Sequence, residues 1–332
     1  MKGSVTLADV ARAAGVSTQT VSRVINKKGE ISHGTRQRVL HAIEQLGYRP
    51  NPMARGLVTN RTFTLGLIVP DVTNPFFPEI VHGAEQMAVE HGYTVILCNT
   101  NENPEREMTV LNMLEARCVD GIILCSSRIP DEQLRPLLQR LGDVVLLNRH
   151  IPLEKVSVVR VDYAEGTRMA VSHLLASQRR RIGFLAGPSH SHSRYMRQQA
   201  FIQVLQESRL HYDPSLVLPC PPNSEGGYQA THDLLRQHGS LDGLLCYNDL
   251  VAVGALQACA ELGMHVPEAL AVVVYDDIPV ARLVSPALTT VAVSKSALGA
   301  HAVRLLLKRL AGDQEGSELV LTPQLVVRAS AP

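Results

Sequence analysis

The segment from Thr6 to Asn26, TLADVARAAGVSTQTVSRVIN, constrains the fold more than any other part of the chain. Its apolar residues repeat at helical spacing on both sides of a short turn, AAGVS, which predicts two helices set at an angle. Thr6 and Ser17 stand where they can cap the first and the second helix. Gly15 tolerates the positive φ that such a turn needs. The segment predicts a helix-turn-helix or, as the alternative, a small helical hairpin on a protein surface.

A third helix is predicted from the segment ISHGTRQRVLHAIEQLG. Ser32 can cap its start and Gly47 can end it. Four apolar residues are expected to close a three-helix core with the first two helices: Val39, Leu40, Ile43 and Leu46. Residues 1–50 are therefore predicted to form an all-α headpiece. Residues 51–61 have a short helical pattern, too small to be stable alone, and are predicted to form a hinge helix and linker.

Charge is distributed unevenly along the 332 residues. Residues 1–61 hold ten Lys/Arg and three Asp/Glu, a net charge of +7, and because the whole chain carries +1, the remainder carries −6. A basic amino-terminal module on an acidic body is the electrostatic footprint of a nucleic-acid-binding protein. An ordinary solvated basic surface would not explain this segregation.

From Thr64 onward, strand-like apolar runs alternate with amphipathic helical patterns. The runs are TLGLIV, TVILCN, GIILC and VVLLN, and the pattern begins again near VSVVRVD with IGFLAG, GLLCYN and LAVVVYD. This alternation is typical of βαβ units and parallel sheets. It predicts two similar α/β lobes with a ligand cleft between them at the carboxyl ends of the strands.

Several protein classes are disfavoured by what the sequence lacks. The six cysteines are scattered and several lie in apolar runs, which predicts buried, reduced thiols. His190 and His192 have no metal-ligand spacing with a Cys or carboxylate, so we expect no metal and no cofactor. No GxGxxG follows a strand, and neither GxxxxGK[ST] nor GxSxG occurs, so an enzyme is not expected. Without a signal-peptide-like or membrane-spanning stretch, the protein is expected to be cytoplasmic.

The chain resembles the lactose-repressor (LacI/GalR) family of bacterial transcription regulators over nearly its whole length. Besides the three predicted helices, the matching segments are PMARGL, LIVPD, NPFF, VDGII, LAGP, ND followed by AVG, YDD and LTTV, in the family's order. The resemblance implies a periplasmic-binding-protein-like core over residues 62–332. Lobe 1 is expected at about 62–161 plus 290–332, and lobe 2 at about 162–289. The implied function is a ligand-responsive, sequence-specific repressor of carbohydrate-utilisation genes.

The second predicted helix presents side chains suited to DNA. Four of them are candidates for the major groove: Thr18, Gln19, Ser22 and Arg23. Glutamine can pair with adenine and arginine with guanine, although Arg23 could instead contact a phosphate. Three further side chains are expected to contact phosphates and fix the register: Thr6, Ser17 and Asn26.

The linker is the second candidate DNA contact. In the family this segment folds into a short helix on the operator, two of them pairing in the minor groove. The residues that match its pattern are Asn51, Ala54, Arg55 and Leu57. Leu57 is an apolar residue in a polar linker, and an intercalating leucine can unstack a base step and kink the duplex.

The resemblance and the loops after the strands indicate one set of ligand-binding candidates. These are Asp71, Phe76, Phe77, Asn148, Arg149, Arg197, Asn248 and Asp276. Arg197, Asn248 and Asp276 are expected to grip hydroxyls or ring heteroatoms of a small molecule. Asp276 could instead order a loop, and Phe77 could simply pack in the core. Asp249 is predicted to cap the helix that begins LVAVGALQ.

The ligand class is left open by the sequence. The chain has no tryptophan, and Pro222 falls near the place where some sugar-binding relatives carry one. Arg149, Arg197 and Lys295 could converge and favour an acidic or phosphorylated ligand, or could simply be solvated.

The expected assembly is a homodimer on a pseudopalindromic operator, because each half-site needs one headpiece. No heptad repeat follows QLVVRAS, so dimers are expected and not tetramers. A sugar or sugar derivative, as inducer or co-repressor, is the expected effector. The rival classes are a periplasmic sugar-binding protein, which would lack residues 1–61, and an α/β enzyme, which would turn over a sugar.

Overall fold

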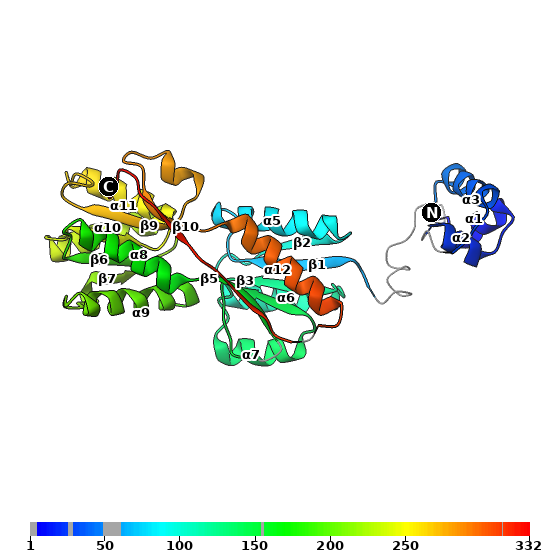
Figure 1. The fold of residues 1–332 in the computed structure, drawn as a ribbon, viewed down its shortest axis with the longest axis horizontal. Coiled ribbons are helices and arrows are strands. Elements are labelled where there is room, and N and C mark those ends of the chain that lie inside the picture. Colours follow the sequence, from blue (N-terminus) through cyan, green and yellow to red (C-terminus); the bar gives the residue numbers. More distant parts are fainter. Residues whose placement is uncertain (1–4, 26–28, 49–60, 154–155, 314) are drawn as a thin grey trace. The chain divides into compact units, whose positions relative to one another are not determined.

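The computed structural model shows two compact units, Met1–Thr62 and Phe63–Pro332, which are described separately (Figure 1). The residues that it describes are 5–25, 29–48, 61–153, 156–313 and 315–332. Within these ranges no helix combines the length and the apolar composition that a membrane span needs.

The described part of the first unit contains three helices, α1 (Leu7–Ala14), α2 (Thr18–Ile25) and α3 (His33–Leu46). The predicted caps are present. Thr6 and Asp9 form a reciprocal capping box, in which Thr6 Oγ1 accepts from Asp9 N at 3.3 Å and Asp9 Oδ2 accepts from Thr6 N at 3.0 Å. The Ser17 hydroxyl accepts from Thr20 N and the Ser32 hydroxyl from Thr35 N. Left-handed Gly15 and Gly47 end α1 and α3.

The core of this headpiece differs from the prediction on α3. Val39 and Ala42 are buried and Ile43 packs against them, but Leu40 is 51% exposed and Leu46 is 37% exposed. The buried positions follow the i, i+3, i+4 spacing of a single helix face, and Leu40, the residue after Val39, is rotated by about 100° away from that face. Leu46 lies near that face but is the last residue of the helix. The prediction that Leu40 and Leu46 belong to the core was therefore wrong.

Lobe 1 of the second unit is a six-stranded, fully parallel sheet in the order β11-β5-β4-β3-β1-β2. Its strands are β1 (Thr64–Val69), β2 (Thr94–Asn99), β3 (Gly121–Cys125), β4 (Val144–Leu147), β5 (Ser157–Val161) and β11 (Glu318–Leu321). Its helices are α5 (Phe76–Glu90), α6 (Pro104–Ala116), α7 (Asp131–Arg140) and α12 (Lys295–Leu310). Helices α5 and α12 pack on one face of the sheet and α6 and α7 on the other.

Lobe 2 repeats this plan with the order β12-β10-β9-β8-β6-β7, in which only the β10–β12 pair is antiparallel. Its strands are β6 (Ile182–Gly187), β7 (Val217–Pro219), β8 (Gly243–Cys246), β9 (Ala271–Asp276), β10 (Thr289–Ala292) and β12 (Gln324–Val326). Its helices are α8 (Tyr163–Ala176), α9 (His192–Glu207), α10 (Ser224–His238) and α11 (Asp249–Glu261), with short η1 (Pro214–Leu216) and η2 (Pro279–Arg282). Helices α10 and α11 cover one face, and α8 and α9 the other.

The chain passes between the lobes three times, which corrects the expected boundary at residue 290. After β5 the chain enters lobe 2, after β10 it returns through α12 and β11, and after β11 it crosses again to β12 (Figure 1). The end of the chain is held in lobe 2, where Ser330 Oγ accepts from Thr289 N at 2.8 Å and the His173 ring donates to Ala331 O at 2.8 Å. Only α12 and β11 of the segment 290–332 thus belong to lobe 1.

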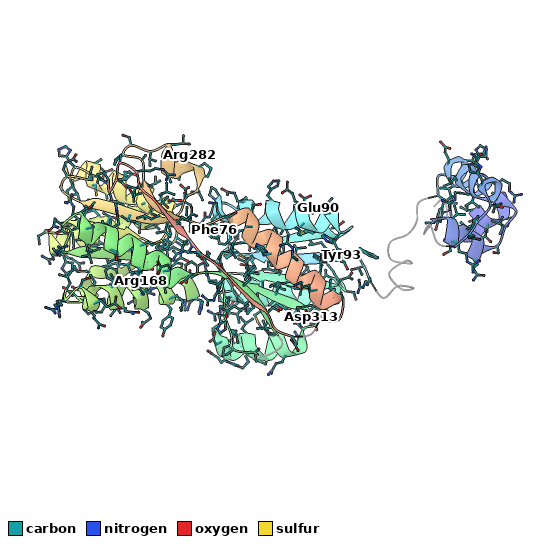
Figure 2. The ribbon with its side chains drawn as sticks, viewed as in Figure 1. Phe76, Glu90, Tyr93, Arg168, Arg282 and Asp313 are labelled. Carbon is teal, nitrogen blue, oxygen red and sulfur yellow. The ribbon has the colours of Figure 1, made fainter. Side chains whose placement is uncertain are left out.

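Five of the six cysteines are buried, as their apolar surroundings predict. The exception to burial is Cys118, which is exposed. Figure 2 shows the side chains on this frame.

Candidate DNA-contact surface and interlobe cleft

Helix α2 has one buried and one exposed face. Val21 and Val24 pack into the headpiece core. On the other side Thr18, Gln19 and Arg23 are exposed, and Ser22 is half-buried. The capping hydroxyls of Thr6 and Ser17 are also exposed. The remaining DNA candidates, Asn26, Asn51, Ala54, Arg55 and Leu57, lie outside the described residues.

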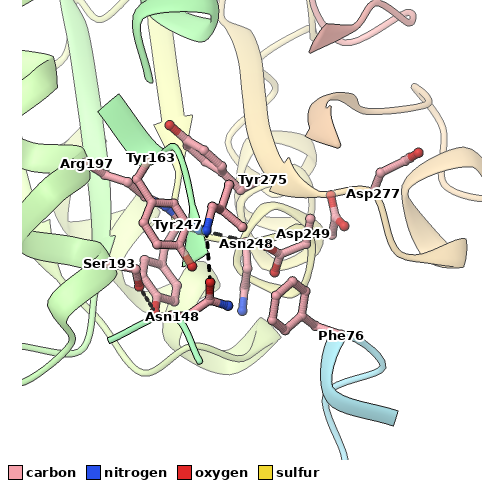
Figure 3. Close-up of polar contacts among 12 residues, drawn as sticks. Phe76, Asn148, Tyr163, Ser193, Arg197, Tyr247, Asn248, Asp249, Tyr275 and Asp277 are labelled. Carbon is pink, nitrogen blue, oxygen red and sulfur yellow. Dashed lines mark hydrogen bonds and ion pairs between the residues drawn. The ribbon is translucent and has the colours of Figure 1, made fainter. Parts of the chain in front are cut away.

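A small cavity of about 30 Å³ lies between the two lobes, where β1, β3, β8 and β9 end. We call it the inner cavity. Five of the predicted ligand residues line it: Phe76, Phe77, Arg197, Asn248 and Asp276. Pro222 lines it as well. Figure 3 shows several of these side chains converging from both lobes.

Arg197, on α9, is the centre of the lobe 2 wall. Its guanidinium carbon lies 3.8 Å from the ring centroid of Tyr275, 4.6 Å from that of Tyr163 and 4.8 Å from that of Tyr247. It also donates to the Tyr247 carbonyl and lies 3.9 Å from Asp276 Oδ1. Because the aromatic faces attract the cation, they help to fix its position beside Asp276.

Asp276 ends β9 in a strained turn. Its φ is 104° and that of Asp277 is 52°, both in the left-handed region that non-glycine residues seldom adopt. Lys295, at the start of α12 in lobe 1, donates to both carbonyls of this turn, at 2.7 and 3.1 Å. Burial raises the pKa of Asp276 to about 6, although Arg197 and Lys295 oppose the shift. The carboxyl group therefore titrates close to neutral pH.

The cap of α11 is Asn248 and not Asp249. Asn248 Oδ1 accepts from Val251 N at 2.9 Å, and its Nδ2 donates to Pro222 O at 3.0 Å. Asp249 is already the first helical residue, and its buried carboxylate accepts from Ile278 N at 2.7 Å. Asp249 therefore orders the loop after β9, and the prediction that it caps the helix was wrong.

Phe76 and Phe77 lie at the start of α5, opposite lobe 2. Their rings meet edge to face with centroids 5.2 Å apart. Both side chains belong to the lobe 1 core and both line the inner cavity. Phe77 therefore packs in the core and also forms part of the apolar wall of the cavity.

Three other predicted residues do not line the inner cavity. Asp71 orders its own turn by accepting from Thr73 N at 2.9 Å. Arg149 points toward α7, where it binds the Asp131 carboxylate and the Ile129 carbonyl. Asn148 lines a separate, neighbouring cavity.

The expected convergence of Arg149, Arg197 and Lys295 on an anionic ligand is not what the structure shows. Arg149 is neutralised by Asp131, and Lys295 is turned to the carbonyls of the Asp276 turn and to Glu79 at 3.6 Å. Only Arg197 of the three lines the inner cavity. The reason is tertiary: each of the other two cations meets an acceptor from a distant part of the chain.

Several lining residues were missed by the sequence reasoning: Asn74, Glu102, Ser126, Arg128, Tyr163, Ser193 and Tyr247. Arg128 is buried and forms a two-point ion pair with Glu102 on the lobe 1 wall. The Tyr247 hydroxyl lies 2.9 Å from the hydroxyls of Ser191 and Ser193. The position of Arg128 just after β3 could have suggested it, because parallel strands end at the ligand edge of the sheet.

A cavity of about 670 Å³ lies elsewhere in lobe 1, between α7, the start of β4 and the end of α12. Its wall is built from lobe 1 alone, and its charged groups, Arg309 and Asp143, are 3.3 Å apart and pair with each other. The interlobe cleft is smaller but brings polar groups of both lobes together, which makes it the candidate ligand site.

Comparisons with known proteins identify the family. Residues 6–51 match the family of bacterial regulatory proteins of the lacI family, and residues 171–331 match the periplasmic binding protein-like domain. The chain is 36% identical over 329 residues to the HTH-type transcriptional repressor PurR of Haemophilus influenzae strain PittEE, covering 98% of both chains. It is also 36% identical over 305 residues to the ribose operon repressor of Halalkalibacterium halodurans, covering 92% of this chain and 90% of the relative.

Solved structures agree with this assignment. The lac repressor dimer bound to operator and the anti-inducer ONPF aligns with a TM-score of 0.89 at 27% identity, over 99% of both chains. The cellobiose complex of the transcriptional regulator CelR aligns with a TM-score of 0.76 at 33% identity, over 98% of this chain and 99% of that one. The chain belongs to the lacI family of bacterial regulatory proteins. It is a DNA-binding transcriptional regulator.

Proposed function

We propose that this chain represses carbohydrate-utilisation genes, and that a small molecule held between the lobes sets its affinity for the operator. The observation that carries the proposal is the interlobe cleft, where Arg197 and Asp276 of lobe 2 face Phe76 and Phe77 of lobe 1. The names of two relatives support a sugar ligand, since one represses a ribose operon and another was solved with cellobiose. We assign no catalytic role to the cleft.

The size of the inner cavity couples ligand binding to lobe movement. Ligand pockets commonly hold about 300–1,000 Å³, and the inner cavity holds about 30 Å³. A sugar can reach Asp276 only if the lobes move apart, so its binding free energy depends on lobe position. A ligand that prefers one lobe arrangement shifts the protein toward it, as inducer or as co-repressor.

The DNA-binding part of the proposal is tested with the full chain. Operator sequences are selected from a fragment library, and affinity is measured by fluorescence anisotropy at several salt concentrations. Gln19→Ala should cost about 1–3 kcal/mol of operator binding and relax preference at one base pair, because Gln19 is exposed on α2. Gln37→Ala, an exposed glutamine on α3, is the matched control and should leave affinity unchanged. Equal effects of the two variants would refute the assignment of α2 as the reading helix.

The effector-binding part of the proposal is tested by two measurements on the same protein, thermal stability and operator affinity. A ligand is sought by thermal shift, and each hit is added to the operator complex. At 100 times its dissociation constant a ligand stabilises the folded state by about 2.7 kcal/mol, which such a scan detects. We expect one hit to change operator affinity as well. Turnover of a sugar by the protein would support the enzyme alternative and overturn the proposal.

We also propose that the repressor is a homodimer in the cytoplasm. One headpiece per half-site of a pseudopalindromic operator requires two copies related by a two-fold axis. Sedimentation of the free chain and of its operator complex should give two chains per operator. A single chain per operator would contradict this part of the proposal.

A further inference from the structure

A second cavity of about 210 Å³ adjoins the inner cavity, and Tyr163 lines both. We call it the outer cavity. Asn148, His150, Arg160 and Glu318 come from lobe 1 strands and the segments after them, and Tyr163, His192 and Met196 come from α8 and α9 of lobe 2. Both lobes therefore build this space, which is roomier than the inner cavity.

Several polar groups around the outer cavity have no hydrogen-bond partner within the described part of the chain. Asn148 is 2% exposed, and its Oδ1 accepts from Val161 N at 3.2 Å. This bond orients the carboxamide, so that its Nδ2 is buried without an acceptor. The hydroxyl of Tyr163 and the rings of His150 and His192 likewise have no hydrogen bond to a described residue. Buried polar groups are normally paired, so an unpaired donor such as this one needs an explanation.

The charges around the outer cavity cancel. The Arg160 guanidinium is bound by the Glu318 carboxylate of the neighbouring strand β11, two residues before Val320, which is the register partner of Arg160. Burial lowers the pKa of His192 to about 4, so its ring is neutral at pH 7 and carries one donor and one acceptor. Met196 adds an apolar surface. The cavity thus offers neutral donors and acceptors beside an apolar contact, and no uncompensated cation.

The inner cavity differs in this respect. Arg128 is bound to Glu102, Arg197 to the Tyr247 carbonyl, and the Asn248 amide to Pro222 O. Most of its hydrogen-bonding groups are engaged by the protein, although Arg197 Nε is buried without an acceptor among the described residues. The larger volume and the unpaired Asn148 amide lie on the other side of Tyr163.

We propose that the outer cavity is a compartment of the effector site that binds a neutral, hydroxyl-bearing ring. This inference rests on the proposed function. It names the effector as a neutral sugar or cyclic polyol, and it excludes a sugar acid or sugar phosphate whose charge enters this compartment. Hydroxyls of such a ring would accept from Asn148 Nδ2 and exchange hydrogen bonds with Tyr163 and His192, while Met196 covers a C–H face.

The experiment compares matched probes on the full chain. The probes are glucose, glucuronate and glucose 6-phosphate; galactose and galacturonate; ribose and ribose 5-phosphate; cellobiose; and myo-inositol. Binding is measured by calorimetry on the unmodified protein, on His192→Phe and on Tyr163→Phe. Both substitutions keep an aromatic ring and remove only the polar group. His190→Phe is the matched control, because His190 lies two residues away in the same loop, is exposed and lines neither cavity.

We expect a neutral probe to bind more tightly than its charged counterpart. His192→Phe and Tyr163→Phe should each weaken it by about two- to tenfold, the value of one hydrogen bond, and His190→Phe should leave it unchanged. Tighter binding of a charged counterpart, no neutral binder in the panel, or a neutral binder that both variants leave unaffected would each overturn the inference.

Operator binding separates this inference from the proposed function. A sugar phosphate that alters operator affinity would sink the neutral-ring assignment and still support a ligand-controlled repressor. A neutral sugar that binds the outer cavity without altering operator affinity would support the neutral-ring assignment and contradict the ligand-controlled repressor.

Discussion

The two lobes use the same packing device with different chain connections. In lobe 2, α10 and α11 follow one another closely in sequence, whereas in lobe 1 α5 pairs with α12 from the far end of the chain. Both pairs meet backbone to backbone at glycines. A Cβ on Gly299 would lie 2.0 Å from Ile80 O, and one on Gly254 would lie 1.9 Å from Ser224 O. This packing requires only that the two helix backbones approach closely at a glycine, so it works for helices that are near or far apart in the sequence.

The walls that the lobes present to the cleft are less alike. Each places a buried arginine there, but Arg128 of lobe 1 is held by the Glu102 carboxylate, whereas Arg197 of lobe 2 is held by three tyrosine rings. A carboxylate neutralises the cation that it positions, and an aromatic face leaves the charge in place. The difference teaches that Arg197, whose ion pair with Asp276 spans 3.9 Å, is less fully neutralised than Arg128.

The largest expected effect tests the shared device. Gly299→Ala and Gly254→Ala should each destabilise the core by more than about 3 kcal/mol, above the usual cost of overpacking, because the new methyl group meets backbone that cannot rotate away. Chemical unfolding of both variants is the measurement. Gly142→Ala is the control, since nothing lies within 4 Å of the added carbon. A mild effect at only one crossing would show that the helix pairs are not equivalent.

A smaller effect compares buried carboxyl groups of the two lobes. Because burial raises the pKa of Asp276 above its ordinary value of 3.8, its ionised form destabilises the folded state. Asp276→Asn should stabilise the protein by up to about 3 kcal/mol above pH 6, and the gain should vanish as the pH falls from about 6 to below 4. Unfolding of both proteins across this range checks the sign and the window.

Glu107 of lobe 1 is the matched case with the opposite expectation. Burial raises the pKa of Glu107 too, but one carboxylate oxygen accepts from the Ser127 hydroxyl and the other from Arg128 N. The NH2 group of a glutamine would face a hydrogen-bond donor, either the Ser127 hydroxyl or Arg128 N. Glu107→Gln should therefore destabilise the folded state at pH 7. Stabilisation by Glu107→Gln would remove the contrast between the lobes.

The smallest effect tests the two ways of holding an arginine. Arg197→Lys replaces a planar group that stacks on three rings, and should cost about 1–2 kcal/mol of unfolding free energy. Arg128→Lys retains the charge beside Glu102 but loses the two-point contact. Both variants are compared by thermal unfolding, with tyrosine absorbance reporting the surroundings of the rings. An equal spectral change for Arg128→Lys and Arg197→Lys would contradict the claim that tyrosine rings hold only Arg197.

Part of the candidate site could be predicted because it lies on short local patterns. Phe76, Phe77, Asn248 and Asp276 lie at strand ends or helix starts, Arg197 lies on the second turn of α9, and all five line the inner cavity. The prediction failed for Arg149 because Asp131 binds it. The sequence analysis also missed Tyr163 and Tyr247. Their apolar neighbours in the sequence suggest core residues, and only the tertiary structure shows that both rings contact Arg197.

By itself the sequence determined the headpiece caps, the alternation of strands and helices and the basic amino-terminal module. Each of these depends on residues within one or two helical turns or on simple charge counts, so the information is local. The tertiary structure decided that α12 returns to α5, that the chain end returns to lobe 2, and which polar groups around the cleft are paired. These outcomes depend on contacts between residues far apart in the chain, where packing selects one partner among many.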